Sequence, residues 1–337
     1  MTSTLSPSLE RSMDAFRSAM QAAVARMDPS SAAMSAYHLG WSAADGTPLQ
    51  APAGKGVRPT LALLSAQAGG ADAADGIPAA VAVELVHNFS LLHDDLMDGD
   101  IERRHRRTVW AIWGAPAAIL TGDAMQALAQ EVLLEADSPH AAAAARLLAA
   151  TTRELIRGQV EDLSFEQRTD VTLAECLDMA GGKTGSLLSA SAAIGAVLAG
   201  APQDTVAALR VFGAQVGLAF QLVDDVLGIW GDPAVTGKPV FSDLRSRKKS
   251  LPVSYALAAD PGGELAGWLD GGDADPDEAG LRRVADLIAA AGGREWALAE
   301  ARRRMALAEG ALDTVDIPEV PRTELVALGR FLVDRQS

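Results

Sequence analysis

Residues 78–98 decide the fold, and they read PAAVAVELVHNFSLLHDDLMD. Apolar side chains between 79 and 92 lie on nearly every side of a helix with 3.6 residues per turn, which is the pattern of a buried helix. The segment then ends in three aspartates, Asp94, Asp95 and Asp98. We therefore predict a buried helix whose last turn is acidic.

The rest of the chain repeats this helical pattern. Apolar spacings of three and four predict further helices at 8–28, 58–69, 116–135, 140–167, 172–180, 184–199, 204–230, 248–259, 280–291, 295–312 and 322–335. Clusters of Gly, Pro and Asp predict loops at 29–55, 231–247 and 260–279. No run of alternating β-branched residues predicts a sheet, and no loop is a long linker. The sequence thus predicts an all-α bundle in a single domain, 1–337.

Composition narrows the possible partners. Of the 337 residues, 49% are hydrophobic and 22% charged, which is typical of a soluble globular protein. A net charge of −15 disfavours nucleic acid and anionic membranes, so an anionic ligand needs a local basic cluster. The most apolar stretch, 187–200, is shorter than the ~20 residues of a membrane span, so no transmembrane segment is expected. The single cysteine, Cys176, fits the reducing environment of the cytoplasm.

Asp94 and Asp98 are four residues apart and therefore share one helix face, about 40° apart around the axis and about 6 Å along it. Two carboxylates at this spacing repel each other unless a cation lies between them. Oxygen ligands suit Mg²⁺, which proteins usually bind with one or two carboxylates plus substrate phosphates. A solvated acidic face is the alternative, but the apolar helix before the pair favours a metal site.

A second apolar segment, FQLVDD at 220–225, also ends in paired aspartates, Asp224 and Asp225. Basic residues follow each pair, namely Arg103 and Arg104 after the first and Lys238, Lys248 and Lys249 after the second. Carboxylates that bind Mg²⁺, with Lys and Arg neutralising the remaining oxygens, are how proteins hold a diphosphate. The two segments therefore suggest one shared site.

Lysine is rare among the basic residues, with 5 Lys against 24 Arg. The lysines are Lys55, Lys183, Lys238, Lys248 and Lys249, and all lie in or beside glycine-rich or turn segments. The compact ammonium group of lysine serves where the planar guanidinium fork does not fit. These positions are therefore candidates for binding an anion.

Together these residues resemble those of the trans-isoprenyl diphosphate synthases, polyprenyl synthetases of the farnesyl and geranylgeranyl diphosphate synthase type. Matching motifs follow the family's order: GKGVRP at 54–59, ELVH at 84–87, DDLMD at 94–98, RR at 103–104, GD at 122–123, GQ at 158–159, KT at 183–184, FQLVDD at 220–225, TGK at 236–238 and LP at 251–252. The resemblance implies about ten core helices around a central cavity, usually in a homodimer. It implies a head-to-tail condensation of isopentenyl diphosphate with an allylic diphosphate.

The resemblance also implies three Mg²⁺ ions. Asp94 and Asp98 would bind two of them on the allylic diphosphate and Asp224 the third, while Asp95 and Asp225 would act through bound water. Breaking the allylic C–O bond releases diphosphate and leaves a carbocation, so charge on the leaving group must be stabilised while water is kept out.

The resemblance implies that the remaining site residues bind one or the other of the two substrates. For the allylic diphosphate they are Lys183 and Lys238, which would steady its phosphates, and Thr184 and Gln221, which would line the path of the cation. For isopentenyl diphosphate they are Lys55, Arg58, His87 and Arg104, with Arg103 near the allylic group and Lys248 among the substrate-binding cations. Taken alone, His87 would be interpreted as a core histidine, and His38 is interpreted as a surface residue.

One position departs from the family pattern, which usually has a third Asp four residues after Asp224. Here that position is Gly228. The change leaves open a terpene cyclase, in which the allylic diphosphate closes on itself, although a cyclase would not need the residues implied for isopentenyl diphosphate. A non-catalytic partner subunit of a synthase is a further alternative, but it would be expected to lose the first aspartate pair.

Product length is predicted from Phe89 and Ser90, which lie about 7.5 and 6 Å down the helix from Asp94. These two residues would form the upper part of the cavity floor. In the trans-isoprenyl diphosphate synthases, aromatic residues at both positions stop growth of the prenyl chain at 15 carbons (C15). One aromatic residue alone commonly allows 20 carbons (C20). The sequence therefore predicts geranylgeranyl diphosphate as the product, with farnesyl diphosphate next.

Overall fold

The computed structural model describes residues 6–49, 56–232, 240–269, 271 and 277–334. Two predicted ligands, Lys55 and Lys238, lie outside the described residues. The chain forms two compact units. Unit 1 comprises Met1–Thr152, Ala190–Arg210 and Leu312–Ala327, and unit 2 comprises Arg153–Ser189, Val211–Ala311 and Leu328–Ser337. That the whole chain is one domain stays a prediction.

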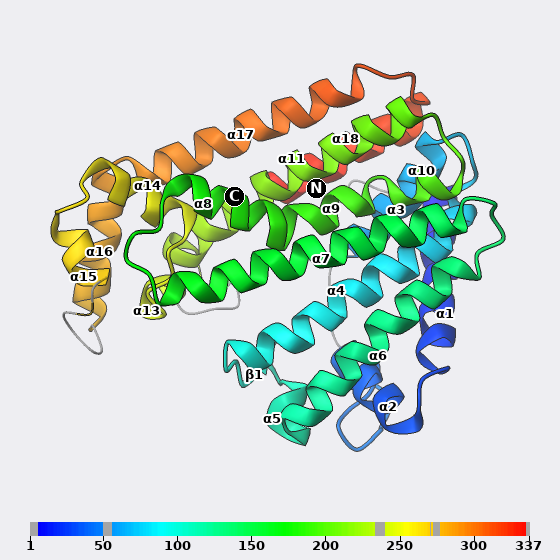
Figure 1. Ribbon diagram of the computed structural model, residues 1–337, viewed down its shortest axis with the longest axis horizontal. Coiled ribbons are helices and arrows are strands. Elements are labelled where there is room, and N and C mark those ends of the chain that lie inside the picture. Colours follow the sequence, from blue (N-terminus) through cyan, green and yellow to red (C-terminus); the bar gives the residue numbers. More distant parts are fainter. Residues whose placement is uncertain (1–5, 50–55, 233–239, 270, 272–276, 335–337) are drawn as a thin grey trace. The chain divides into compact units, whose positions relative to one another are not determined.

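Unit 1 is built around α4 (Ile77–Met97), the helix predicted to be buried. The other elements of this unit are α1 (Pro7–Val24), α2 (Pro29–His38), α3 (Val57–Ala68), η1 (Ala73–Gly76), β1 (Glu102–Arg103), β2 (Arg106–Arg107), α5 (Val109–Trp113), α6 (Ala115–Leu134) and α10 (Ile194–Leu198). Helix α4 packs against α3 and α6 (Figure 1). Its Val83, Leu85 and Val86 are fully buried, which confirms the prediction of a buried helix.

Unit 2 contains a long helix and a group of short ones. Its elements are α8 (Leu173–Ala180), the π-helical turn η2 (Gly181–Gly185), α13 (Ser242–Arg245), α14 (Leu251–Ala259), α15 (Glu264–Leu269) and α16 (Glu278–Ala290), together with most of α9 (Ser186–Ser191), α11 (Gln203–Trp230) and α17 (Gly293–Leu312). Helix α18 (Glu319–Val333) is divided, with 319–327 in unit 1 and 328–333 in unit 2. Helix α7 (Ala141–Glu166) contributes residues to both units.

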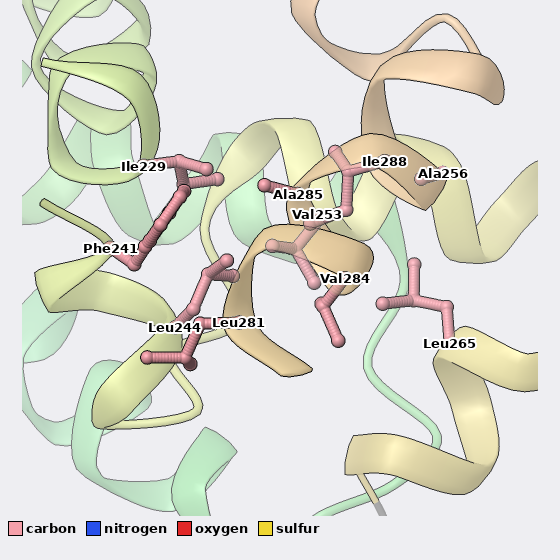
Figure 2. Packing of buried hydrophobic residues seen from close by; sticks show 10 residues of the cluster. All are labelled: Ile229, Phe241, Leu244, Val253, Ala256, Leu265, Leu281, Val284, Ala285 and Ile288. Atoms are coloured by element: carbon pink, nitrogen blue, oxygen red, sulfur yellow. The ribbon is translucent and has the colours of Figure 1, made fainter. Parts of the chain in front are cut away.

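A hydrophobic cluster holds the short helices of unit 2 against the end of α11. Ile229 of α11 belongs to the same buried cluster as Phe241 and Leu244, which flank the start of α13 (Figure 2). Helices α14 and α16 supply further members of this cluster, including Val253 and Ile288. Packing therefore anchors the end of α11 and the start of α13, on either side of residues 233–239.

The all-α prediction is confirmed, and a few boundaries are wrong. The predicted loop 29–55 contains α2, which begins where the side chain of Asp28 accepts hydrogen bonds from the N–H groups of Ser30 and Ser31 and Pro29 fills the first turn. Helix α13 lies in the predicted loop 231–247 and α15 in 260–279. The predicted helix 184–199 is interrupted, because η2 occupies its start and a break separates α9 from α10.

Among the described residues, α11 is long and apolar enough to cross a membrane by length and composition alone. Half of its most apolar window is buried inside the structure, and the core helices of soluble proteins satisfy the same criterion. The finding therefore gives weak support to a membrane span.

Candidate active site

The first aspartate pair lies at the end of α4. Asp98 keeps a right-handed helical conformation, and its N–H donates a hydrogen bond of 2.8 Å to the backbone oxygen of Asp94. The helical spacing predicted for the two carboxylates is therefore preserved beyond the last residue of α4. Asp94 is half-buried and Asp98 is exposed.

Asp95, next to Asp94, forms an ion pair with Arg103. Its carboxylate is buried, and Oδ1 accepts a hydrogen bond of 2.6 Å from Nε of Arg103. Burial raises the pKa of Asp95 to about 6, against the opposing effect of Arg103. Its Oδ2 is also buried and has no partner among the described residues. Asp95 thus orients Arg103, while its predicted action through bound water stays a prediction.

The hairpin of β1 and β2 presents Arg103 and Arg104. The strands pair Arg103 with Arg106, and the turn between them places Arg104 at φ 52° in the left-handed region. Arg106 fixes the hairpin, because its guanidinium donates hydrogen bonds of 2.7 and 2.8 Å to the backbone oxygens of Tyr37 and Ser42. Two adjacent guanidinium groups are thereby displayed on a tethered turn.

Arg58 of α3 and His87 of α4 lie close enough to Arg104 for its charge to act on both. Burial lowers the pKa of Arg58 to about 10, against the raising effect of Glu84. The pKa of His87 is held well below its usual value by burial and by Arg58 and Arg104. Nε of Arg58 is buried without a partner among the described residues. This guanidinium is therefore incompletely satisfied by the residues that the structure describes.

His38, at the end of α2, joins this group, and its interpretation as a surface residue is wrong. It is half-buried and lines a pocket with Asp95, Arg103 and Arg104. Burial, then the charges of Arg103 and Arg104, lower its pKa to about 3, so the imidazole is neutral. Its Nε2 is buried without a partner in the described part of the chain. The sequence signal that could have placed His38 on a helix is the Asp28-Pro29 pair, which begins α2.

We call these side chains the cationic group. Its charged members are the guanidiniums of Arg58, Arg103 and Arg104 and the carboxyls of Glu84 and Asp95, and its neutral members are His38 and His87. Guanidiniums outnumber carboxyls, so the group has an excess of positive charge and of hydrogen-bond donors. An anion with several oxygens, such as a diphosphate, suits it.

In unit 2, Lys183 lies on the π-helical turn η2. Its ammonium donates a hydrogen bond of 2.6 Å to Oδ2 of Asp162 on α7. A Cβ atom on Gly158 would lie 2.2 Å from the backbone nitrogen of Lys183, so only glycine lets α7 approach this turn so closely. Asp162 was not predicted, although it follows the quoted Gly158-Gln159 motif within the same helix.

A chain of hydrogen bonds links the neighbouring predicted residues. The Thr184 hydroxyl donates to Oε1 of Gln221 at 2.7 Å, and Nε2 of Gln221 donates to Oδ1 of Asp225 at 2.7 Å. Oδ2 of Asp225 accepts from the backbone N–H of Leu251 at 2.8 Å. Burial raises the pKa of Asp225 to about 7, against the lowering effect of Lys248. Asp225 is therefore held through both of its oxygens and fixes the Gln221 amide through Oδ1, whereas Asp224 beside it is exposed.

Lys248 is surrounded by carboxylates. Burial lowers its pKa, but four aspartates outweigh that effect and raise it above the usual value; they are Asp225, Asp162, Asp243 and Asp224. We call these four aspartates, with Lys183 and Lys248, the carboxylate group. Here carboxyls outnumber ammonium groups, so the excess charge is negative.

This donor set fits Mg²⁺, which prefers hard oxygen ligands. Within the described ranges, no three His, Cys, Asp or Glu side chains gather closely enough to enclose a metal ion. An ion bound by one or two of these carboxylates would need additional oxygens, and a diphosphate supplies them. The arrangement therefore suits a metal ion that arrives with its substrate.

The two residues predicted to set product length are buried on α4. Phe89 packs edge-on against His93, with ring centroids 5.4 Å apart. The Ser90 hydroxyl donates a hydrogen bond of 2.8 Å to the backbone oxygen of His87. A Cβ atom on Gly122 of α6 would lie 2.3 Å from Nε2 of His93, so α6 holds the ring that Phe89 contacts.

Comparisons with known proteins agree with this chemistry. The family model described as "Polyprenyl synthetase" matches residues 46–284. The chain is 54% identical over 316 residues to a (2E,6E)-farnesyl diphosphate synthase of Mycobacterium tuberculosis, covering 93% of this chain and 88% of that one. It is 42% identical to a geranylgeranyl diphosphate synthase of the same organism, covering 97% and 93%. The structure of a polyprenyl synthetase from Streptomyces coelicolor A3(2) superimposes with a TM-score of 0.91 at 51% identity, covering 96% of this chain and 98% of that one.

Proposed function

The chain belongs to the polyprenyl synthetase family and is a trans-prenyltransferase, and on this premise we propose that it joins isopentenyl diphosphate head to tail to an allylic diphosphate with Mg²⁺. The observation that carries the proposal is the opposite charge excess of the two groups. The cationic group has more guanidiniums than carboxyls, and the carboxylate group has more carboxyls than ammonium groups. A metal-free diphosphate suits the first, and a metal-bound diphosphate suits the second.

We assign isopentenyl diphosphate to the cationic group. Arg58 and Arg104 would bind its phosphate oxygens through charge-assisted hydrogen bonds, with Lys55 as a further cation. His87 is neutral because of burial and the nearby arginines, so it would donate one N–H to a phosphate oxygen without adding charge. Arg103, which Asp95 holds through a hydrogen bond to Nε, would lie near the allylic substrate.

We assign the allylic diphosphate to Asp94, Asp98 and Asp224, together with Lys183 and Lys238. When bound, Mg²⁺ would neutralise this diphosphate and so stabilise its departure as the C–O bond breaks. Lys183 is already held by Asp162 at 2.6 Å, which fixes its ammonium before a substrate arrives.

The hydrogen-bonded chain of unit 2 would stabilise the allylic cation. Asp225 and Thr184 fix the amide of Gln221 from both ends, so its dipole does not need to reorient during the reaction. A carbonyl oxygen has two lone pairs, and Oε1 of Gln221 uses one to accept from Thr184. The other can stabilise a nearby positive charge.

Product length has two candidates. The single aromatic residue at Phe89, followed by Ser90, favours the C20 product geranylgeranyl diphosphate. The M. tuberculosis relative named as a farnesyl diphosphate synthase favours the C15 product. We propose the C20 product first. Its test is the product distribution of Phe89→Ala, which should shift to longer chains, with Phe16→Ala as a control that truncates another buried aromatic residue of unit 1. Unchanged lengths would place the floor of the pocket elsewhere.

The decisive assay for the reaction incubates the protein and Mg²⁺ with dimethylallyl, geranyl or farnesyl diphosphate, each with and without isopentenyl diphosphate. Longer prenyl diphosphates that form only when both substrates are present would support condensation. The second candidate is the cyclase, which Gly228 leaves open, and consumption of the allylic compound alone would identify it. We also propose a cytoplasmic homodimer, which sedimentation of the purified protein would test.

A further inference from the structure

His93 packs against Phe89, the residue proposed to limit product length. The two rings meet edge-on at an interplanar angle of 88°, with centroids 5.4 Å apart. Residues four apart on a helix share one face, so both side chains leave α4 on the same side. Edge-on packing is a favourable geometry for two aromatic rings, and each ring therefore restricts the rotamer of the other.

Helix α6, which lies beside α4 in unit 1 (Figure 1), holds the His93 ring from the other side. Nε2 of His93 lies 3.1 Å from the backbone oxygen of Ile119, and this nitrogen is the donor because a carbonyl oxygen can only accept. A Cβ atom on Gly122 would lie 2.3 Å from Nε2 and 2.6 Å from Cδ2 of the same ring. Only glycine at 122 lets the imidazole lie against the backbone of α6.

These contacts lead away from the first aspartate pair, although His93 is next to Asp94 in the sequence. Successive residues of a helix are about 100° apart around its axis, so His93 does not share the face of Asp94 and Asp98. Asp123 of α6 lies 3.9 Å from Nε2, beyond hydrogen-bond distance. The ring of His93 thus connects Phe89 to α6.

We propose that His93 is a specificity-determining residue for product length, because it holds the Phe89 ring in the position that ends chain growth. This inference rests on the proposed function. His93 is a positioning residue that acts through Phe89, and α6 fixes it through Ile119 and Gly122. A smaller side chain at 93 would leave space beside Phe89 into which the ring can turn, and so make room for a longer prenyl chain.

The test compares the product lengths of variants supplied with Mg²⁺, geranyl diphosphate and radiolabelled isopentenyl diphosphate. His93→Ala removes the ring, whereas His93→Phe keeps a ring beside Phe89. The double variant Phe89→Ala/His93→Ala shows whether His93 acts through Phe89. The control is His140→Ala, because His140 of unit 1 also lies against a glycine: a Cβ atom on Gly200 would lie 2.5 Å from its Nε2.

We expect His93→Ala to raise the ratio of longer products to the wild-type product by about 3- to 10-fold, the scale of one lost aromatic contact. His93→Phe and His140→Ala should keep the wild-type ratio. The double variant should match Phe89→Ala, because without the ring at 89 His93 has nothing to hold. Gly122→Ala, which displaces the imidazole, should also lengthen the products, and it replaces His93→Ala if that variant does not fold.

A merely structural role would lower the melting temperature and the rate of His93→Ala and leave the product ratio unchanged, which would overturn the inference. Equal lengthening by His93→Ala with and without Phe89 would overturn it too, because His93 would then act independently of Phe89. Either result, in a protein that still forms longer prenyl diphosphates, leaves the proposed reaction standing. A wild-type protein that forms none would overturn the proposed function itself.

Discussion

The cationic group of unit 1 and the carboxylate group of unit 2 differ in how far each satisfies itself. In the cationic group, Nε of Arg58 and Nε2 of His38 are buried without partners in the described part of the chain. In the carboxylate group, Lys183 donates to Asp162, and Asp225 accepts from Gln221 and from the N–H of Leu251, at distances of 2.6–2.8 Å. The described residues thus leave buried nitrogens of the first group without partners, whereas the named side chains of the second are hydrogen-bonded.

The pKa shifts give the same contrast. Burial is the main cause that lowers the pKa of Arg58 and of Arg104; a neighbouring arginine lowers each pKa further, and Glu84 opposes the shift. Neighbouring carboxylates raise the pKa of Lys248 against the effect of burial. A diphosphate without metal would relieve the first group, whereas a diphosphate that brings Mg²⁺ would relieve the excess of carboxylates in the second.

The largest expected effect comes from the metal ligands. Asp94→Asn should lower kcat/KM on the order of 10³-fold, because it removes charge that holds the cation needed at the leaving group. Steady-state kinetics at saturating Mg²⁺ measure it. Asp137→Asn makes the same change on an exposed turn of unit 1 and should leave the rate unchanged. An Asp94→Asn protein within a factor of three of the wild type would contradict the assignment.

The next effect separates the two substrates. Arg58→Gln should raise the KM for isopentenyl diphosphate by roughly 30- to 100-fold, the loss of about 2–3 kcal/mol expected for a charge-assisted hydrogen bond, and change the KM for the allylic diphosphate little. Lys183→Gln should do the reverse. Each variant is the matched control of the other. Equal changes in both KM values would show that the two groups do not divide the substrates.

Two adjacent aspartates sharpen the comparison within unit 2. Asp225→Asn should lower the free energy of unfolding by about 1–3 kcal/mol, because its two oxygens accept from Gln221 and Leu251 and an amide can serve only one of these donors. Asp224→Asn, at an exposed position, should change it by less than about 0.5 kcal/mol but raise the Mg²⁺ requirement. Urea denaturation measures the difference, and equal destabilisation would refute it.

The smallest effect is the pH dependence of His38. Its pKa is lowered to about 3 in the folded protein, so between pH 6.5 and 3 the unfolded chain binds a proton there that the folded protein does not. Stability is therefore lost as pH falls below 6.5, by about 1 kcal/mol at pH 5.5. His38→Gln should lose less stability than the wild type between pH 7.5 and 5.5. The exposed His140→Gln should behave as the wild type, and an unchanged slope in His38→Gln would rule out the buried neutral imidazole.

Local pattern predicted the helices and most of the candidate residues. The apolar periodicity of α4 and α11 placed both aspartate pairs at helical positions, because burial on all sides leaves a clear signal. His38 and Asp162 were missed for a different reason. Their importance depends on which side chains the fold brings beside them, namely Arg103 for His38 and Lys183 for Asp162.

The most direct test of the account is the Mg²⁺ dependence of binding, measured by calorimetry on the wild-type protein with isopentenyl diphosphate and with a thiodiphosphate analogue of the allylic substrate that does not react. The account predicts that isopentenyl diphosphate binds nearly equally well with Mg²⁺ and with chelator, and that the analogue loses its binding when Mg²⁺ is removed. The same Mg²⁺ dependence for both ligands would contradict the division between the cationic group and the carboxylate group.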